Sequence, residues 1–212
     1  MGIATRFSDG YRRHVVPRIV DVACGAKAMK PDRDRAAAGL SGEIVELGFG
    51  SGHNVGSYPP EVTLVRAVEP SELGRKLSAD RVAASAVPVV FSGLRGEALD
   101  LPDRSCDGAL CTFTLCTIPG VEQALAELRR VLRPGAPFHF LEHGVSPDDG
   151  VERWQHRLDP IQQALCDGCH LTRDPVALVR EAGFEIESVD SAYAQGPKPW
   201  VYMTLGRARN PA

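Results

Sequence analysis

The sequence predicts an α/β fold in which a doubly wound sheet of seven strands carries helices on both faces. The sheet is expected to be mostly parallel, with its last strand antiparallel. Strand-like and helix-like segments alternate through the first two thirds of the chain, and one long apolar run indicates a central strand buried on both faces. Such alternation is typical of parallel strands joined by crossover helices, and these sheets bind ligands outside the carboxyl ends of their strands.

Length and composition fit one domain, residues 1–212, with 43% hydrophobic and 24% charged residues. The net charge of −3 offers no basic face, so a nucleic-acid partner is not expected. No run of about 18 apolar residues exists to span a membrane, and no signal-peptide core precedes the first charges. We therefore expect a cytoplasmic protein whose six cysteines are reduced thiols.

The N-terminal part, residues 1–42, is expected to be a helical segment. Residues 11–29 have apolar side chains at helical spacing and predict one or two helices, and residues 30–42 are interpreted as a polar linker. We expect an amphipathic helix packed on the sheet. The alternative is a segment that closes over the ligand site, with Tyr11 or His14 near the pocket.

Five strands are then predicted in chain order. Short β-branched or apolar segments indicate them at 43–48, 62–70, 87–93, 106–115 and 136–144. The intervening helices are expected at 71–85, with Ser71 as N-cap, and at 121–135. In the second helix one face is apolar, and the helix should stop at Pro134-Gly135; that face is formed by Ala124, Leu125, Leu128, Val131 and Leu132.

The last third of the chain adds an acceptor-side segment, residues 145–183. Helices are expected within it at 151–166 and 174–182. Two closing strands, 184–193 and 200–208, follow and are joined by a Gly-Pro turn.

A glycine-rich turn follows the first predicted strand. Gly48, Gly50 and Gly52 form a G-x-G-x-G pattern, which lets the chain turn sharply and lets a ligand lie against bare peptide. A dinucleotide-binding turn would have glycine or alanine at the next position, where this chain has His53. The pattern favours a nucleoside without a pyrophosphate.

Two carboxylates follow the next two strands. Glu69 ends the second strand, 21 positions after Gly48, where a carboxylate can accept both hydroxyls of a ribose. Glu97 lies in the loop after the third strand, where it can meet an adenine edge. Three glycines and two acids at neighbouring strand ends predict a nucleoside site.

Five segments resemble the class I S-adenosylmethionine-dependent methyltransferases: "ELGFGSG", "VEP", "GEALDLP", "CDGALCTFTL" and "ALAELRRVLRPGAPFHFLEHG". The resemblance extends from about residue 43 to 207. It implies a Rossmann-like sheet and S-adenosyl-L-methionine as the cofactor. The residues it implies for cofactor binding are Glu46, Gly48, Gly50, Ser51, Gly52, Asn54, Glu69, Pro70, Glu97, Ala98 and Thr112.

The chain also resembles, more narrowly, the methyltransferase-like-seven branch, whose members are small thiol S-methyltransferases. Its motifs are Leu141-Glu142-His143, Leu158-Asp159-Pro160, Asp167-Gly168-Cys169 and Leu171-Thr172-Arg173. The resemblance implies a small-molecule acceptor, with a thiol favoured. Animal members carry an apolar N-terminal membrane anchor that this sequence lacks, which implies a cytosolic form.

The expected catalytic residues lie near the carboxyl ends of strands or in the helical region that follows. A thiol reacts as its thiolate, and free thiols have a pKa near ~8.5, so a weak base suffices. His143 is the first choice for that base because its ordinary pKa is near neutral. Glu142 and Asp159 are the further candidates, and no metal ligand is expected. Thr112 and Thr114 end the fourth strand and are expected to border the transferred methyl.

The stretch "CDGCH" also allows other interpretations. Cys166, Cys169 and His170 match a haem-attachment pattern, and together with His156 they could supply zinc ligands. We expect instead a packed turn that lines or supports the acceptor pocket. A haem- or metal-binding protein stays open as a distant alternative. Within the enzyme class, the alternative is an N-methyltransferase of an amine or a phospholipid head group.

Overall fold

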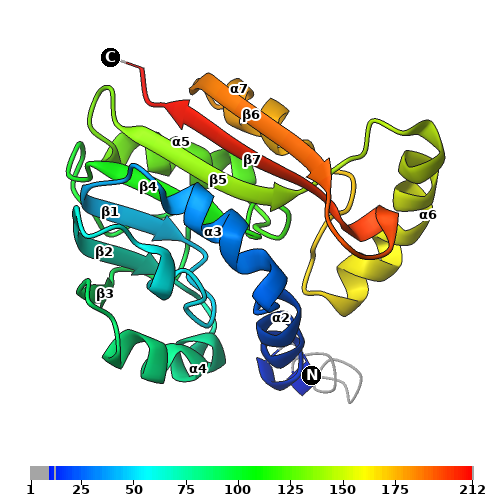
Figure 1. The fold of residues 1–212 in the computed structure, drawn as a ribbon, viewed down its shortest axis with the longest axis horizontal. Helices are drawn as coiled ribbons and strands as arrows, with labels where there is room; N and C mark the ends of the chain where they lie inside the picture. Colours follow the sequence, from blue (N-terminus) through cyan, green and yellow to red (C-terminus); the bar gives the residue numbers. More distant parts are fainter. Residues whose placement is uncertain (1–9, 12, 212) are drawn as a thin grey trace.

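The computed structural model describes residues 10–11 and 13–211 (Figure 1). Seven strands form one sheet in the order β3-β2-β1-β4-β5-β7-β6. β7 pairs antiparallel with both β5 and β6, while the pairs among the first five strands are parallel. The predicted fold class is therefore confirmed.

The strands have the following bounds: β1 Gly42–Leu47, β2 Val62–Val68, β3 Val89–Phe91, β4 Gly108–Thr112, β5 Pro137–His143, β6 Glu185–Tyr193 and β7 Tyr202–Arg209. The helices are α2 Val16–Cys24, α3 Lys30–Ala37, α4 Glu72–Ala83, α5 Val121–Val131, α6 Asp149–Leu165 and α7 Pro175–Glu181. Every predicted strand and helix is present within a few residues. Ser71 caps α4 as expected, since its side chain accepts a hydrogen bond from the backbone N–H of Gly74 at 3.0 Å.

The prediction of a polar linker at 30–42 is wrong, because this segment contains α3. Pro31 lies in the first turn, where its missing N–H costs no helical hydrogen bond. Arg33, Ala36 and Ala37 are buried against the sheet, where α3 packs on β4, β5 and β7. Tertiary packing stabilises a helix that its polar composition conceals.

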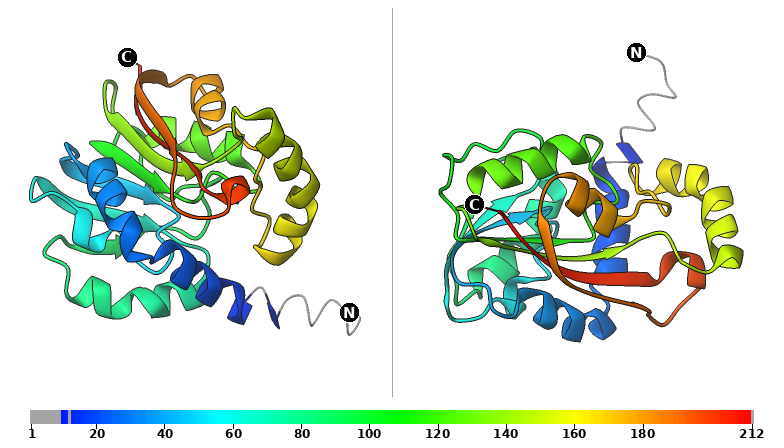
Figure 2. Two further views of the ribbon diagram at one scale, coloured as in Figure 1. Left: turned by 45° about the vertical axis from the view of Figure 1, so that its right-hand side comes forward. Right: turned by 90° about the horizontal axis from the view of Figure 1, so that it is seen from above.

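Two apolar clusters fill the space on either side of the sheet. α5 and α7 lie on one face and α3 on the other, as the green, orange and blue helices show (Figure 2). The predicted apolar face of α5 is confirmed, because all five of its members are buried. Apolar packing on both faces fixes the sheet and hence the positions of its carboxyl ends.

β4 is shorter than the predicted strand. Its five residues are all buried, and the chain turns away at Phe113, which has a φ of +54°. The apolar run continues into the β4 loop, residues 113–120, at the carboxyl edge of the sheet.

α6 follows β5 and stands apart from the sheet, beside the short 198–200 turn (Figure 1). The indole N–H of Trp200 donates to the side-chain oxygen of Gln162 at 3.0 Å and joins the two. Among the residues described here, no helix combines the length and apolarity needed to cross a bilayer.

Candidate active site

The glycine turn, residues 48–52, has the backbone conformation that its sequence predicts. Gly48, Gly50 and Gly52 have φ values of +74°, +56° and +80°, a region that other residues rarely adopt. A Cβ atom on Gly48 would lie 2.0 Å from the Thr114 Oγ1, whereas one on Gly50 would meet no described residue within 4 Å. Gly48 thus lets the β4 loop approach closely, and Gly50 leaves bare peptide facing open space.

Glu69 lies directly behind this turn. Its two carboxylate oxygens accept hydrogen bonds from the backbone N–H groups of Gly50 at 2.6 Å and Ser71 at 2.7 Å. Burial raises the pKa of Glu69, and these two hydrogen bonds partly oppose the increase. A carboxylate oxygen can accept two hydrogen bonds, so each oxygen has capacity left for one hydroxyl. Pro70, the next expected residue, is exposed.

A buried polar network joins the ends of β1 and β4. The Asn54 amide donates to Glu46 Oε1 at 2.9 Å and to Thr112 Oγ1 at 3.0 Å. The Arg33 guanidinium donates to Asn54 Oδ1 at 2.7 Å and to Thr112 Oγ1 at 3.0 Å, and the Tyr58 hydroxyl donates to Glu46. The structure thus brings together three expected cofactor residues, Glu46, Asn54 and Thr112.

Sequence reasoning missed Arg33 and Tyr58 in this network. Arg33 was hidden because its helix was interpreted as a linker, although Pro31 at the second helical position is a signal of a helix start. Tyr58 comes from the connection between β1 and β2, where no periodic pattern distinguishes it.

α2 packs over the glycine turn. The Ser51 hydroxyl donates to Asp21 Oδ1 at 2.6 Å, and the His53 Nε2 lies 2.9 Å from the same oxygen. At the other end of the N-terminal segment, the Tyr11 hydroxyl donates to the Leu165 carbonyl oxygen of α6 at 3.0 Å. The N-terminal segment therefore reaches from the glycine turn to α6, while His14 is exposed.

The other two expected cofactor residues lie in the loop after β3. Glu97 accepts a hydrogen bond from the Gly120 backbone N–H at 3.4 Å and lies 3.9 Å from Arg95. Ala98 is exposed. Glu97 thus contacts the start of α5 rather than the glycine turn.

Glu142 is fully buried at the end of β5. Its carboxylate accepts hydrogen bonds from the Thr114 backbone N–H at 2.8 Å and the Leu115 backbone N–H at 3.1 Å. The Cys111 thiol also donates to it at 3.5 Å. Burial raises the pKa of Glu142, and the backbone hydrogen bonds oppose that increase. These contacts hold the β4 loop in place.

His143, the next residue, belongs to a thiol–imidazole cluster with Cys116 and Cys169. Its Nε2 lies 3.2 Å from the Cys169 Sγ, which lies 3.6 Å from the Cys116 Sγ. Burial alone would lower the pKa of His143, but the hydrogen bond to Cys169 and nearby negative charges raise it. Its Nδ1 is buried and has no hydrogen-bond partner among residues 10–11 and 13–211.

Asp159 lies inside α6 and organises the loop that follows. Its carboxylate accepts hydrogen bonds from the Leu171 backbone N–H and the Gln163 amide, both at 2.6 Å, and lies 3.4 Å from the His170 ring. The backbone N–H of His170 donates to the Cys116 carbonyl oxygen at 2.9 Å. The loop after α6 is thus joined directly to the β4 loop.

The residues of the "CDGCH" stretch do not lie in one cluster. Cys169 is buried and points to Cys116 and His143, whereas Cys166 and His170 lie outside that cluster. His156 pairs with Glu152 on α6 at 3.7 Å. Within the part of the chain that the structure describes, the ligand set expected for the distant metal alternative is not assembled.

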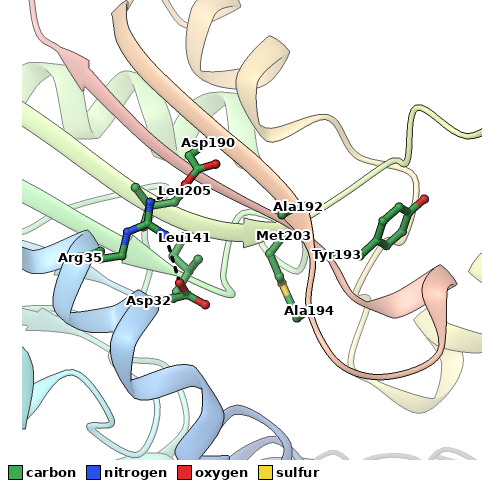
Figure 3. A pocket seen from close by; sticks show the side chains of 9 residues that line it. All are labelled: Asp32, Arg35, Leu141, Asp190, Ala192, Tyr193, Ala194, Met203 and Leu205. Carbon is green, nitrogen blue, oxygen red and sulfur yellow. Dashed lines mark hydrogen bonds and ion pairs between the residues drawn. The ribbon is translucent and has the colours of Figure 1, made fainter.

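A separate pocket lies between α3 and the strands β5, β7 and β6 (Figure 3). Arg35 crosses it and pairs with Asp32 at 3.3 Å and with Asp190. Its lining includes Met203 but none of the expected site residues. We place the candidate site at the glycine turn and the β4 loop instead, because the buried carboxylates of Glu69 and Glu142 and the His143 imidazole lie there.

The residues of the glycine turn fit the nucleoside part of S-adenosylmethionine. Bare peptide at Gly50 faces open space, and Glu69 keeps two unused acceptor positions beside it. We expect these groups to hold the ribose.

Glu46 should make the stability of the ligand-free protein depend on pH. Burial raises its pKa from 4.5 to about 7, so between these values the folded chain binds more protons than the unfolded chain. The stability that protonated Glu46 contributes is complete below its unfolded pKa and is lost as the pH rises through the folded pKa. Glu46→Gln should remove this loss, which amounts to about 3 kcal/mol in the free energy of unfolding.

Urea denaturation at a series of pH values measures this effect. The exposed residue Glu61 provides the control, since Glu61→Gln should reproduce the wild-type curve. Parallel pH curves for wild type and Glu46→Gln would contradict the prediction.

Comparisons with known proteins agree with this geometry. Residues 45–140 match the family model described as a methyltransferase domain. The chain is 33% identical to human thiol S-methyltransferase TMT1A over 77% of this chain and 68% of that protein. It is 34% identical to rat thiol S-methyltransferase TMT1B over 79% of this chain and 69% of that protein.

A solved S-adenosylmethionine-dependent methyltransferase from Mesorhizobium loti has the same fold. The TM-score is 0.63 at 19% identity, over 87% of this chain and 98% of that chain. The resemblance stated from the sequence motifs is confirmed, and S-adenosylmethionine is the cofactor. From its motifs, its fold and these relatives, the chain belongs to the class I S-adenosylmethionine-dependent methyltransferases, in the branch of the thiol S-methyltransferases TMT1A and TMT1B.

Proposed function

We propose that this methyltransferase transfers the methyl group to the sulfur of a small thiol. The relatives named as thiol S-methyltransferases support this acceptor class. The observation that carries the proposal is the His143 imidazole beside the carboxyl edge of the sheet, with a buried nitrogen that no described protein group satisfies. An acceptor thiol brought to this imidazole can be converted to its thiolate.

S-adenosylmethionine supplies a methyl group on a positively charged sulfur, which a thiolate attacks in line so that S-adenosylhomocysteine leaves. The chain's own residues have three tasks. The glycine turn and Glu69 hold the nucleoside, and His143 assists removal of the thiol proton. Glu142 and Asp159 act as positioning residues, because their hydrogen bonds go to the backbone of the β4 loop and of the loop after α6.

We also propose that residues 145–183 form the acceptor side of the site and that the protein works in the cytoplasm. Cys169 of this segment and Cys116 are free thiols only 3.6 Å apart, which fits a reducing compartment.

A methyl-transfer screen tests the acceptor class. Small thiols, amines, phenols and phospholipids are each incubated with the enzyme and S-adenosylmethionine, and methylated products are identified by mass spectrometry. Turnover of thiols is expected. Turnover of amines or phospholipids without any thiol product would replace the proposal with the N-methyltransferase alternative.

Glu69→Ala should weaken the binding of S-adenosylhomocysteine by roughly 1–3 kcal/mol, because charged hydrogen bonds to the ribose are lost. This corresponds to about 5- to 150-fold in the dissociation constant. Calorimetric titration measures it. Glu72→Ala, an exposed position in α4, is the matched control and should bind like wild type. Equal affinity of Glu69→Ala and wild type would remove Glu69 from the site.

A further inference from the structure

We propose that Cys116, His143 and Cys169 form a zinc site with three protein ligands and an open fourth position that takes the sulfur of the acceptor. The cation site stands on geometry alone, and its role in acceptor binding rests on the proposed function. The sequence predicted no metal ligand, and the set differs from the "CDGCH" residues except for Cys169.

Two of the three separations between ligand atoms are close to those of a tetrahedral site. The His143 Nε2 and Cys169 Sγ are 3.2 Å apart, the two Sγ atoms are 3.6 Å apart, and all three ligand atoms lie within 4.8 Å of one another. Zinc binds thiolate sulfur at about 2.3 Å and imidazole nitrogen at about 2.0 Å, which puts neighbouring ligand atoms about 3.5–3.8 Å apart. A cation can enter this cluster with small shifts of the side chains.

The backbone around the cluster is fixed by hydrogen bonds that do not involve the thiols. Glu142 accepts from the backbone N–H groups just before Cys116, and Asp159 accepts from the Leu171 backbone N–H. The His170 backbone N–H then joins the two loops by donating to the Cys116 carbonyl oxygen at 2.9 Å. Ligands held this way need little reorganisation when a cation binds.

Three protein ligands are typical of zinc sites in which the fourth position takes water or substrate. Cys116 and Cys169 would bind as thiolates after releasing their protons to solvent, and their two negative charges would neutralise the cation. When an acceptor thiol binds, its sulfur forms a bond to zinc, its S–H bond breaks, and the proton passes to solvent. The cation then promotes loss of the thiol proton, which the proposed function assigned to the free His143 imidazole. His143 instead serves as a ligand of the cation.

The β4 loop that carries Cys116 also reaches the glycine turn. Thr114, two residues before Cys116, has its Oγ1 3.5 Å from the Gly48 carbonyl oxygen of the glycine turn. With Nε2 on the cation, the His143 Nδ1 carries a hydrogen, and it lacks an acceptor among the residues that the structure describes.

Two thiols and one imidazole also satisfy one another through weak hydrogen bonds, so the test must separate that arrangement from a cation site. Tag-free protein is loaded with zinc, dialysed against zinc-free buffer, and analysed for metal. Stoichiometric zinc is expected in wild type, with a loss of at least tenfold in Cys116→Ser, Cys169→Ser and His143→Gln. Cys166→Ser and His170→Gln are matched controls from the neighbouring loop and should retain zinc.

Cobalt in place of zinc gives a readout in wild type that does not depend on any variant folding. Thiolate-to-cobalt absorption and intense visible bands are expected, and the visible bands should shift when a small thiol is added. Wild type without bound metal, or equal loss of zinc in controls and ligand variants, would overturn the site. Stoichiometric metal whose spectrum no thiol changes would overturn its role in acceptor binding.

Methyl transfer is measured separately, with chelator-treated and zinc-loaded enzyme. Loss of thiol methylation on chelation, restored by zinc, supports the proposal. Full thiol methylation by metal-free enzyme overturns it and leaves the proposed function intact. Bound zinc with no methylation of any thiol would instead defeat the proposed function.

Discussion

Gly48→Ala is expected to lower the free energy of unfolding by about 2–5 kcal/mol and to abolish binding of S-adenosylmethionine. A residue with a Cβ atom at a φ of +74° costs about 1–2 kcal/mol in backbone strain. The new methyl would also lie 2.0 Å from the Thr114 Oγ1, and relieving such an overlap typically costs about 1–3 kcal/mol. Urea denaturation measures the stability, and calorimetric titration measures the binding.

Gly50→Ala is the matched variant, because the two effects separate there. The φ of +56° imposes the same strain, but a Cβ atom meets nothing within 4 Å among the residues that the structure places, so the stability should fall by only about 1–2 kcal/mol. Cofactor binding should still weaken, because the methyl occupies the space that the ligand requires. Equal stability of Gly48→Ala and Gly50→Ala would show that the close approach of Thr114 has no energetic importance.

Glu142→Ala is expected to lower the free energy of unfolding by about 3–5 kcal/mol. The carboxylate is fully buried, and its removal leaves the Thr114 and Leu115 backbone N–H groups without an acceptor. Each unsatisfied buried donor costs about 1–3 kcal/mol, and the lost side-chain volume adds to this. Chemical denaturation measures the loss.

Glu142→Ala should also change the binding of the acceptor more than the binding of the cofactor. Glu142 holds the β4 loop, so the KM for the acceptor should rise more than the dissociation constant of the cofactor. Glu142→Gln keeps the shape and one acceptor oxygen, and its effects should fall between those of wild type and Glu142→Ala. The exposed Glu122 on α5 is the control, since its replacement by alanine should stay within about 0.5 kcal/mol of wild type. A wild-type stability for Glu142→Ala would contradict the role of this carboxylate.

Local sequence patterns predicted most of the fold. A helix that buries only one face shows that face as a regular spacing of apolar residues. The apolar spacing of α5 and the cap at Ser71 are properties of neighbouring residues, and both are confirmed. α3 was missed because its stability comes from the sheet, on which Arg33 and Ala37 are buried. The turn at Phe113 was missed because an apolar run does not show where a strand ends.

The same distinction between local patterns and tertiary packing applies to the candidate site. Gly48, Gly50 and Glu69 follow successive strands with a recognisable spacing, so the sequence alone brought them together. Cys116 and His143 come from separate segments, which the pairing of β4 with β5 and the hydrogen bonds of Glu142 to the β4 loop bring together. No spacing in the chain signals that contact, because it depends on the topology of the sheet.

The antiparallel course of β7 has a practical consequence for handling the protein. β7 starts beside the carboxyl end of β5, where His143 faces Met203, and finishes at the opposite edge, where Pro137 faces Arg209 (Figure 1). A reporter or surface linker fused after the last strand would therefore emerge at the edge of the sheet opposite to His143.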